Sequence, residues 1–254
     1  GISAFYHDSA ACLIDNGEII FAAQEERFSR KKHDSGFPVL TISFILNKYK
    51  IKLIDIEKII FYEKPFLKFE RILETYIGFA PNGFKQFSKS LPVWVKQKLF
   101  LKNEILKNLK EIDKEIIDKE KIMFSEHHLS HAASAFYPSP FNKSIVLTAD
   151  GVGERATTTI AIGDENKIQI VKEIRFPHSL GLLYSAFTYY TGFKVNEGEY
   201  KLMGLAPYGE PIYVNKILDN LVDVKSDGSF RLNQTYFDYS TNLTMTNKNF
   251  DDLF

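Results

Sequence analysis

The sequence contains two sets of three short apolar runs, and each set is followed by residues with helical periodicity. The first set includes the turn Asp15-Asn16-Gly17, and Asn-Gly between apolar runs is a strong signal for a β-hairpin. The expected strands cover residues 2–5, 10–14 and 18–24 in the first set and 144–149, 157–162 and 168–174 in the second. This repeated βββα plan predicts an α/β protein with an internal duplication.

Helical periodicity fills much of the chain between and after these strands. A helix is expected over 38–49, with Pro38 in its first turn. Residues 65–119 are mostly helical in pattern, and the apolar positions of the stretch 96–119 predict one packing face. Those positions are Leu99, Ile105, Leu109, Ile112 and Ile116, with Trp94 as a candidate anchor. Strands are also expected at 56–62 and 121–124, helices at 129–136, 180–191 and 212–222, and no structure at 242–254.

The composition narrows the class of protein. Lysine plus arginine and aspartate plus glutamate number 32 each, so no overall charge draws the chain to nucleic acid or to a membrane. Cys12 is the only cysteine and cannot form an internal disulfide, which predicts a reducing, cytoplasmic location.

The chain starts on Gly1 and stops on Asp-Asp-Leu-Phe. We therefore expect a piece of a longer protein.

His127 and His131 are the first candidates for chemistry. They are four residues apart, so a helix places them on one face, one turn from each other. Asp150 follows a run that reads as a buried strand. Two imidazoles and a carboxylate suit zinc or ferrous iron. The pattern is not that of a zinc protease, because His128 stands where the general-base glutamate would be. The alternative is that one histidine packs or caps while the others are solvated.

Two turns are candidates for phosphate binding. Gly151 and Gly153 follow the strand at 144–149, and glycines there let backbone N–H groups approach an oxyanion. Tyr6-His7-Asp8-Ser9 is the matching turn of the first strand set. An ordinary hairpin turn remains the alternative for the glycines.

Other charged residues and histidines each have a possible functional role and a possible structural role. Lys201 lies in a glycine-rich segment and either neutralises phosphate charge or is a surface lysine. The run from Glu25 to His33 is either a solvated loop or a patch that binds an anion or a polar substrate. His33 itself is expected to be solvated, with a substrate contact as the alternative. His178 either lines a cleft or caps the following helix.

Four segments occur in an order that resembles a known family. They are YHDSAA at 6–11, EERFSRK at 25–31, HHLSHAASAFY at 127–137 and GEYKLMGLAPYG at 198–209. Together they resemble the N-terminal region of the NodU/CmcH carbamoyltransferase family, from residue 1 to about 210. The resemblance implies an actin-like ASKHA (ribonuclease H-like) fold of duplicated βββαβα architecture. On this basis we expect a first lobe at 1–140, with a helical insert at about 65–119, and an incomplete second lobe at 141–254.

The resemblance also implies a reaction. The family transfers a carbamoyl group from carbamoyl phosphate to a hydroxyl of a sugar-containing or natural-product acceptor, by way of carbamoyl adenylate made from ATP in a C-terminal YrdC-like domain. It implies a metal, most often iron, at positions that match His127, His131 and Asp150. A further aspartate ligand, the YrdC-like domain and most of the adenosine site are expected beyond Phe254, so this chain alone is expected to be inactive.

The same resemblance suggests roles for the two turns. His7 is the candidate general base for the acceptor hydroxyl, because an imidazole pKa of about 6.5 suits proton transfer near neutrality. Asp8, Ser9, Gly151 and Gly153 are expected to contact the nucleotide. Lys201 is expected to offset charge on departing AMP.

Other functions and assemblies stay open on the sequence. The alternatives are an ATP-dependent kinase or hydrolase of the same fold, or a non-catalytic module that a metal stabilises. A homodimer is compatible with the sequence.

Overall fold

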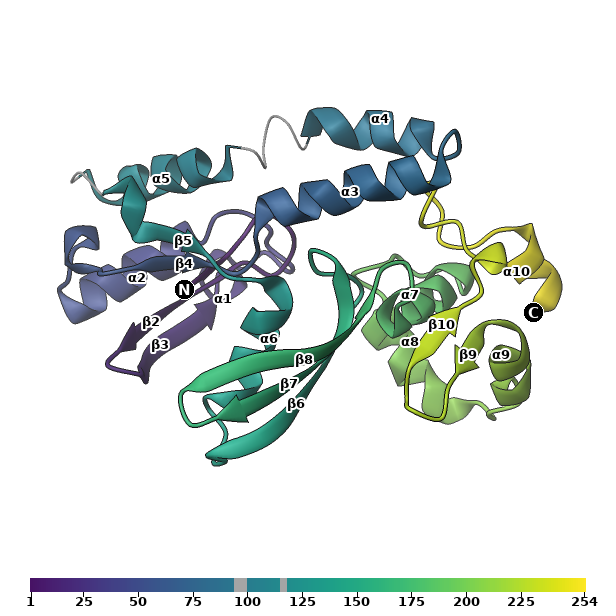
Figure 1. Ribbon diagram of the computed structural model, residues 1–254. Helices are drawn as coiled ribbons and strands as arrows, with labels where there is room; N and C mark the ends of the chain where they lie inside the picture. Colours follow the sequence, from purple (N-terminus) through teal and green to yellow (C-terminus); the bar gives the residue numbers. More distant parts are fainter. Residues whose placement is uncertain (94–99, 115–117) are drawn as a thin grey trace. The chain divides into compact units, whose positions relative to one another are not determined.

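The computed structural model describes residues 1–93, 100–114 and 118–254, which form two compact units (Figure 1). The first unit comprises Gly1–Phe66 and Val93–His127, and the second comprises Leu67–Pro92 and His128–Phe254. Trp94, Leu99 and Ile116, three of the residues predicted to form a packing face, lie outside the described residues.

The first unit is built on a five-stranded mixed sheet with strand order β3-β2-β1-β4-β5. β1, β2 and β3 pair antiparallel, whereas β4 and β5 add parallel strands beside β1. The hairpin between β2 and β3 turns at Asn16 and Gly17, both of which have positive φ. The strands are β1 (Ile2–Ser3), β2 (Ala10–Asp15), β3 (Glu18–Gln24), β4 (Ile59–Phe61) and β5 (Ile122–Phe124).

Helices α2 (Val39–Tyr49) and α5 (Leu101–Ile112) supply further residues of the core of this unit. Ile105 and Leu109 of α5 are fully buried, which confirms the predicted packing face for the positions that the structure describes. The short helix α1 (Glu26–Ser29) follows β3. Glu25, just before it, is only 4% exposed, and its carboxylate accepts hydrogen bonds from the N–H groups of Leu40 and Thr41. Glu25 therefore caps the N-terminus of α2, where a negative charge is favoured.

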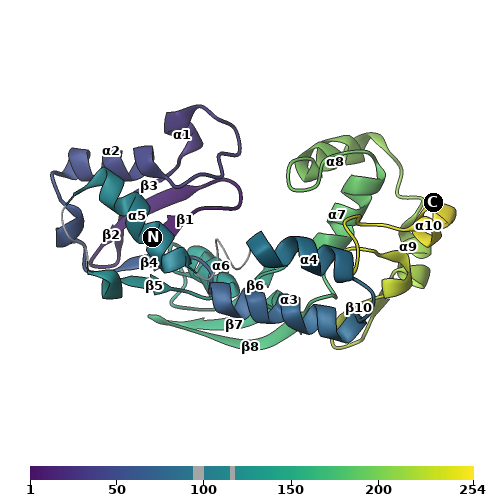
Figure 2. The same ribbon diagram turned by 90° about the horizontal axis from the view of Figure 1, so that it is seen from above.

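The second unit begins with the long helix α3 (Pro65–Phe79, from Leu67 on in this unit), which runs beside α4 (Phe84–Val93) (Figure 2). The rings of Tyr76 and Phe87 stack between the two helices with centroids 4.4 Å apart. A three-stranded antiparallel sheet, in the order β6-β7-β8, follows helix α6 (His127–Phe136). The strands are β6 (Lys143–Ala149), β7 (Ala156–Asp164) and β8 (Lys167–Arg175).

The end of the second unit is a small subassembly of helices around a β-hairpin. Its core includes Leu221, Leu232 and Phe250, packed against α7. The elements are α7 (Leu180–Tyr190), α8 (Glu199–Leu205), α9 (Val214–Asn220), β9 (Val222–Val224), β10 (Phe230–Leu232) and α10 (Lys248–Leu253). In the described part of the chain, no helix combines the length and the apolar character that crossing a membrane requires.

The mixed α/β class is confirmed, and four local expectations need correction. The first strand ends at Ser3, because Phe5 and Asp8 have positive φ and leave the sheet. The charged run from Glu25 is not simply a solvated loop, since Glu25 is buried under α2. The helix predicted over 212–222 is shorter, and Val222 begins strand β9 instead. The tail predicted to lack structure contains α10.

Helix α10 generates a test of the fold. The Phe250 side chain is fully buried and its ring meets those of Phe187, Tyr190 and Phe237. We expect Phe250→Ala to lower the free energy of unfolding by about 3–5 kcal/mol, because it leaves a cavity in this core. Urea unfolding followed by circular dichroism measures the change. The exposed neighbour Asp251 provides the control, and Asp251→Ala should cost less than about 1 kcal/mol; equal losses would contradict the packing described here.

Candidate metal centre

Helix α6 carries two of the three candidate ligands. It is rich in alanine, a strong helix former, and it presents His128, Ala132 and Phe136 as a buried stripe. This stripe packs on Val146 and Ala161 of the sheet. His127 and His131 are one turn apart beside this stripe. The predicted helix is thus confirmed, two residues longer at its start.

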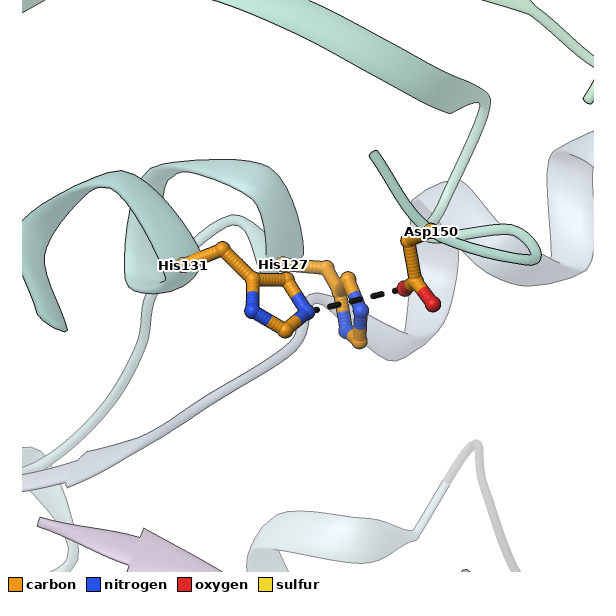
Figure 3. Close-up of side chains that lie close together, drawn as sticks. All are labelled: His127, His131 and Asp150. Carbon is orange, nitrogen blue, oxygen red and sulfur yellow. Dashed lines mark ion pairs between the residues drawn. The ribbon is translucent and has the colours of Figure 1, made fainter. Parts of the chain in front are cut away.

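Asp150 completes the group directly after β6. Figure 3 shows the rings of His127 and His131 and the carboxylate of Asp150 directed toward one another. One ligand atom from each residue lies within 4.8 Å of the others, and His131 Nε2 is 3.6 Å from Asp150 Oδ2. Two ligands of one tetrahedral zinc or iron ion are separated by about 3.3 Å when each lies about 2.0–2.1 Å from the metal. The donor set and its spacing therefore fit a metal ion after small side-chain movements.

The electrostatics of the pair His131–Asp150 also fit a cation site. The hydrogen bond to the Asp150 carboxylate raises the pKa of His131 above its usual value, burial opposes the shift, and charge attraction adds to it. The carboxylate thus favours positive charge at this position, whether it is carried by a proton or by a metal ion.

The backbone around Asp150 is held by α7. Ser179 donates from its hydroxyl to the carbonyl oxygens of Asp150 and Gly151, at 2.9 and 2.7 Å, and accepts from Leu182 N–H as the helix cap. Gly181 lets the helix come close, because a Cβ there would lie 2.6 Å from backbone atoms of Asp150 and Gly151. Nothing in the periodicity of the sequence indicated these two residues, although Ser179 before an apolar helix is a recognisable cap.

Helix α3 holds the other end of the same turn. Arg71 Nη1 donates to the carbonyl oxygen of Gly153 at 2.9 Å. Arg155 Nη2 lies 2.9 Å from carboxylate oxygens of both Glu70 and Glu74. The part of the predicted insert that lies in the second unit therefore supports the turn after β6.

The two glycines of this turn are engaged within it. Gly151 N–H donates to the Asp150 carboxylate at 2.6 Å, and Gly153 N–H donates to the carbonyl oxygen of Ala156 at 3.0 Å. In this conformation neither N–H group faces outward. A nucleotide contact at Gly151 and Gly153 stays a prediction, and it requires these hydrogen bonds to open or to be shared.

In the first unit, Asp8 joins two histidines. Its carboxylate oxygens lie 2.8 Å from His7 Nδ1 and 3.0 Å from His33 Nδ1. Burial raises the pKa of Asp8, but the hydrogen bonds from His33 and His7 and their charge outweigh it, so the pKa is lowered. His33, expected to be solvated, is instead a partner of the predicted His7–Asp8 turn. The contact between His33 and Asp8 could not be predicted from the sequence, because the charged run separates the two residues.

Ser9 has a structural place in the same turn. Its N–H donates to the carbonyl oxygen of Asp34, and its carbonyl oxygen accepts from Glu25 N–H. Its side chain is 1% exposed, and its hydroxyl has no hydrogen-bond partner among the described residues. The nucleotide contacts expected of Asp8 and Ser9 stay predictions.

Comparison with known proteins now identifies the family. The family model described as "Carbamoyltransferase N-terminus" matches residues 1–254, the whole chain. The chain belongs to this family. An uncharacterized protein of Synechocystis sp. is 59% identical over 255 residues, which cover 100% of this chain and 42% of that protein. The nodulation protein NolNO of Sinorhizobium fredii is 34% identical over 233 residues, 91% of this chain and 32% of that protein. The chain thus spans well under half the length of these relatives.

Helix α8 carries the last predicted residue of this carbamoyltransferase domain. Lys201 is exposed, with its ammonium 6.0 Å from the centre of the Tyr200 ring. Glu199, two residues earlier, accepts hydrogen bonds from Ser185 Oγ and Asn196 N–H and so fixes the start of α8 on α7. Lys201 belongs to the second unit, whereas His7 belongs to the first.

His178 does not have the capping role that was one of its two expected roles. Ser179 caps α7, and His178 Nδ1 instead accepts a hydrogen bond from the N–H of Leu232 in β10. A place in a cleft stays a prediction. Burial, with the charge of Arg231, lowers the pKa of His178, which suits a neutral ring that accepts a hydrogen bond.

The Asp8 cluster predicts a dependence of stability on pH. Because the folded pKa of Asp8 lies below the unfolded value of about 3.9, the carboxylate stabilises the fold above that pH and the effect is lost as the pH falls through the folded pKa. We expect Asp8→Asn to lower the melting temperature at about pH 6, with the difference shrinking as the pH falls below about 4.

Thermal unfolding followed by circular dichroism at several pH values measures this difference. Glu18→Gln, which removes the same charge from an exposed position on β3, provides the control and should change little. A deficit of Asp8→Asn that is constant with pH would contradict the role given to this carboxylate.

Proposed function

We propose that the chain is the N-terminal part of an O-carbamoyltransferase. It would move a carbamoyl group from carbamoyl phosphate, by way of carbamoyl adenylate, to a hydroxyl of a sugar-containing or natural-product acceptor. The observation that carries the proposal is the convergence of His127, His131 and Asp150 in a chain that the carbamoyltransferase family matches from end to end. Relatives more than twice as long are consistent with further domains that supply the adenylate.

The proposed fold is the actin-like ASKHA fold. The strand order β3-β2-β1-β4-β5 supports a ribonuclease H-like first lobe, and the second antiparallel meander, β6-β7-β8 followed by α7, supports a duplicated plan. The proposed lobes are residues 1–140 and 141–254, the second of them incomplete. The single cysteine, Cys12, is compatible with the cytoplasmic location that we propose.

His127, His131 and Asp150 would hold the metal, for which we propose Fe²⁺, with Zn²⁺ as the ion that accepts the same ligands. A divalent ion at this position supplies Lewis-acid polarisation of a bound carbonyl or phosphate oxygen. Ser179, Gly181 and Arg71 would keep the turn that bears Asp150 in place.

His7 would act as the general base. Its Nδ1 is bound to Asp8, so the carboxylate fixes the ring orientation and Nε2 is the atom left to accept a proton from the acceptor hydroxyl. The hydroxyl oxygen then forms a bond to the carbamoyl carbon while the bond from that carbon to the AMP phosphate oxygen breaks. AMP leaves with the bonding electrons, and Lys201 would offset its charge.

The proposal is tested with the protein that includes its C-terminal region. Incubation with carbamoyl phosphate, ATP and a panel of sugar-containing acceptors should yield an acceptor heavier by one carbamoyl group in mass spectrometry. His127→Ala should lose the metal, by elemental analysis, and lose transfer, while adenylate formation persists. A gain of a phosphoryl group would instead indicate a kinase, and loss of folding on chelation without nucleotide binding would indicate a structural metal.

The role of His7 has its own test. His7→Ala should slow single-turnover transfer from preformed adenylate by about 10²–10⁴-fold, the usual contribution of a general base. Metal content and adenylate formation, measured on the same variant, provide the controls and should stay at wild-type values. A normal single-turnover rate would remove His7 as the base.

A further inference from the structure

A chain of hydrogen bonds links α6 to the sheet beside the candidate ligands. His128 Nδ1 lies 2.7 Å from Thr148 Oγ1, and Thr148 Oγ1 lies 2.7 Å from Thr159 Oγ1. The three residues are 3%, 7% and 1% exposed, so water does not compete for these bonds. The chain connects α6, β6 and β7 within the second unit.

These hydrogen bonds lie next to the three candidate metal ligands in the sequence. His128 is next to His127 and one turn from His131, whose ring centre is 6.1 Å away. Thr148 is two residues before Asp150, which directly follows Ala149, the last residue of β6. The hydrogen bond from His128 to Thr148 therefore joins the helix that bears the histidine ligands to the strand that leads to the carboxylate ligand.

The apolar contacts between α6 and the sheet fix the position of the helix along the strand less closely than the hydrogen bond from His128 to Thr148 does. Farther along the helix, Ala132 and Phe136 pack on Val146 and Ala161. The Phe136 ring is close enough to Gly163 that a Cβ there would lie 2.5 Å from it. Apolar contacts hold the helix on the sheet but are not directional, whereas a hydrogen bond weakens steeply when its geometry changes.

We propose that His128 and Thr148 are positioning residues of the metal centre. They set the separation between the histidines of α6 and the carboxylate of Asp150. The proposal rests on the metal-binding role in the proposed function and deepens it. A metal site tolerates ligand distances only within about 0.2 Å, so a shift of the helix along the strand directly weakens binding.

The test compares substitutions of nearly equal shape in the full-length protein. Thr148→Val removes the hydroxyl that bonds to His128, and Thr148→Ser keeps a hydroxyl. Co²⁺ serves as the probe, because its visible absorption reports both affinity and ligand geometry. We expect Thr148→Val to weaken Co²⁺ binding at least about 10-fold and to alter the spectrum, the size of effect known for residues that support metal ligands. Thr148→Ser should restore both toward wild type.

Thr159→Val is the matched control, since it also removes a buried hydroxyl but leaves the bond between His128 and Thr148. It should lower the melting temperature and leave Co²⁺ affinity near the wild-type value. If Thr148→Val does not fold, His128→Asn, which keeps a polar atom near the Nδ1 position, is compared with His128→Leu, which does not. The Leu variant should bind more weakly.

The outcomes are distinct. Unchanged affinity and spectrum in Thr148→Val, or in His128→Leu, would overturn the positioning role while the metal centre stands. Equal losses in Thr148→Val and Thr159→Val would overturn it as well, because they would indicate a general loss of stability. Failure of the full-length wild-type protein to bind Co²⁺ would overturn the metal centre itself, and the positioning role with it.

Discussion

The candidate centre depends on how α6 is seated against the end of β6. The positions of His127 and His131 are set by helix α6, and the position of Asp150 is set by the end of strand β6. The ligand distances are thus a property of packing, in which small residues such as Ala132 and Gly163 permit close approach and the polar chain through Thr148 gives alignment. His131 and Asp150 belong to the second unit, and His127 is the first residue of the helix that bears His131.

A second constraint acts on the turn after β6. Ser179 and Gly181 hold it from α7, and Arg71 and Arg155 tie it to α3. The turn is consequently fixed on two sides by segments far apart in the sequence. This arrangement suits a carboxylate that must keep its place when a cation binds, because a preorganised ligand loses little freedom on binding.

The sequence predicted features whose signals are local. Helical spacing placed His127 and His131 on one face, short apolar runs located the strands of both sets, and Asn16-Gly17 located the first hairpin. It did not predict features that need distant partners. Glu25 is charged but buried, because its carboxylate accepts a hydrogen bond from the N-terminus of α2. His33 is hydrogen-bonded to Asp8, which is 25 residues away in the sequence. The tail looked polar, although Phe250 and Phe254 pack its helix into an aromatic core.

The central claim is that His127, His131 and Asp150 bind one divalent metal ion. Anomalous X-ray diffraction from crystals grown with Fe²⁺ or Zn²⁺, measured at the absorption edge of the metal, tests this most directly. We predict a single strong anomalous peak at about 2.0–2.2 Å from one atom of each of the three side chains. Crystals of the metal-treated protein without a peak at these residues, or with the metal bound elsewhere, would contradict the account.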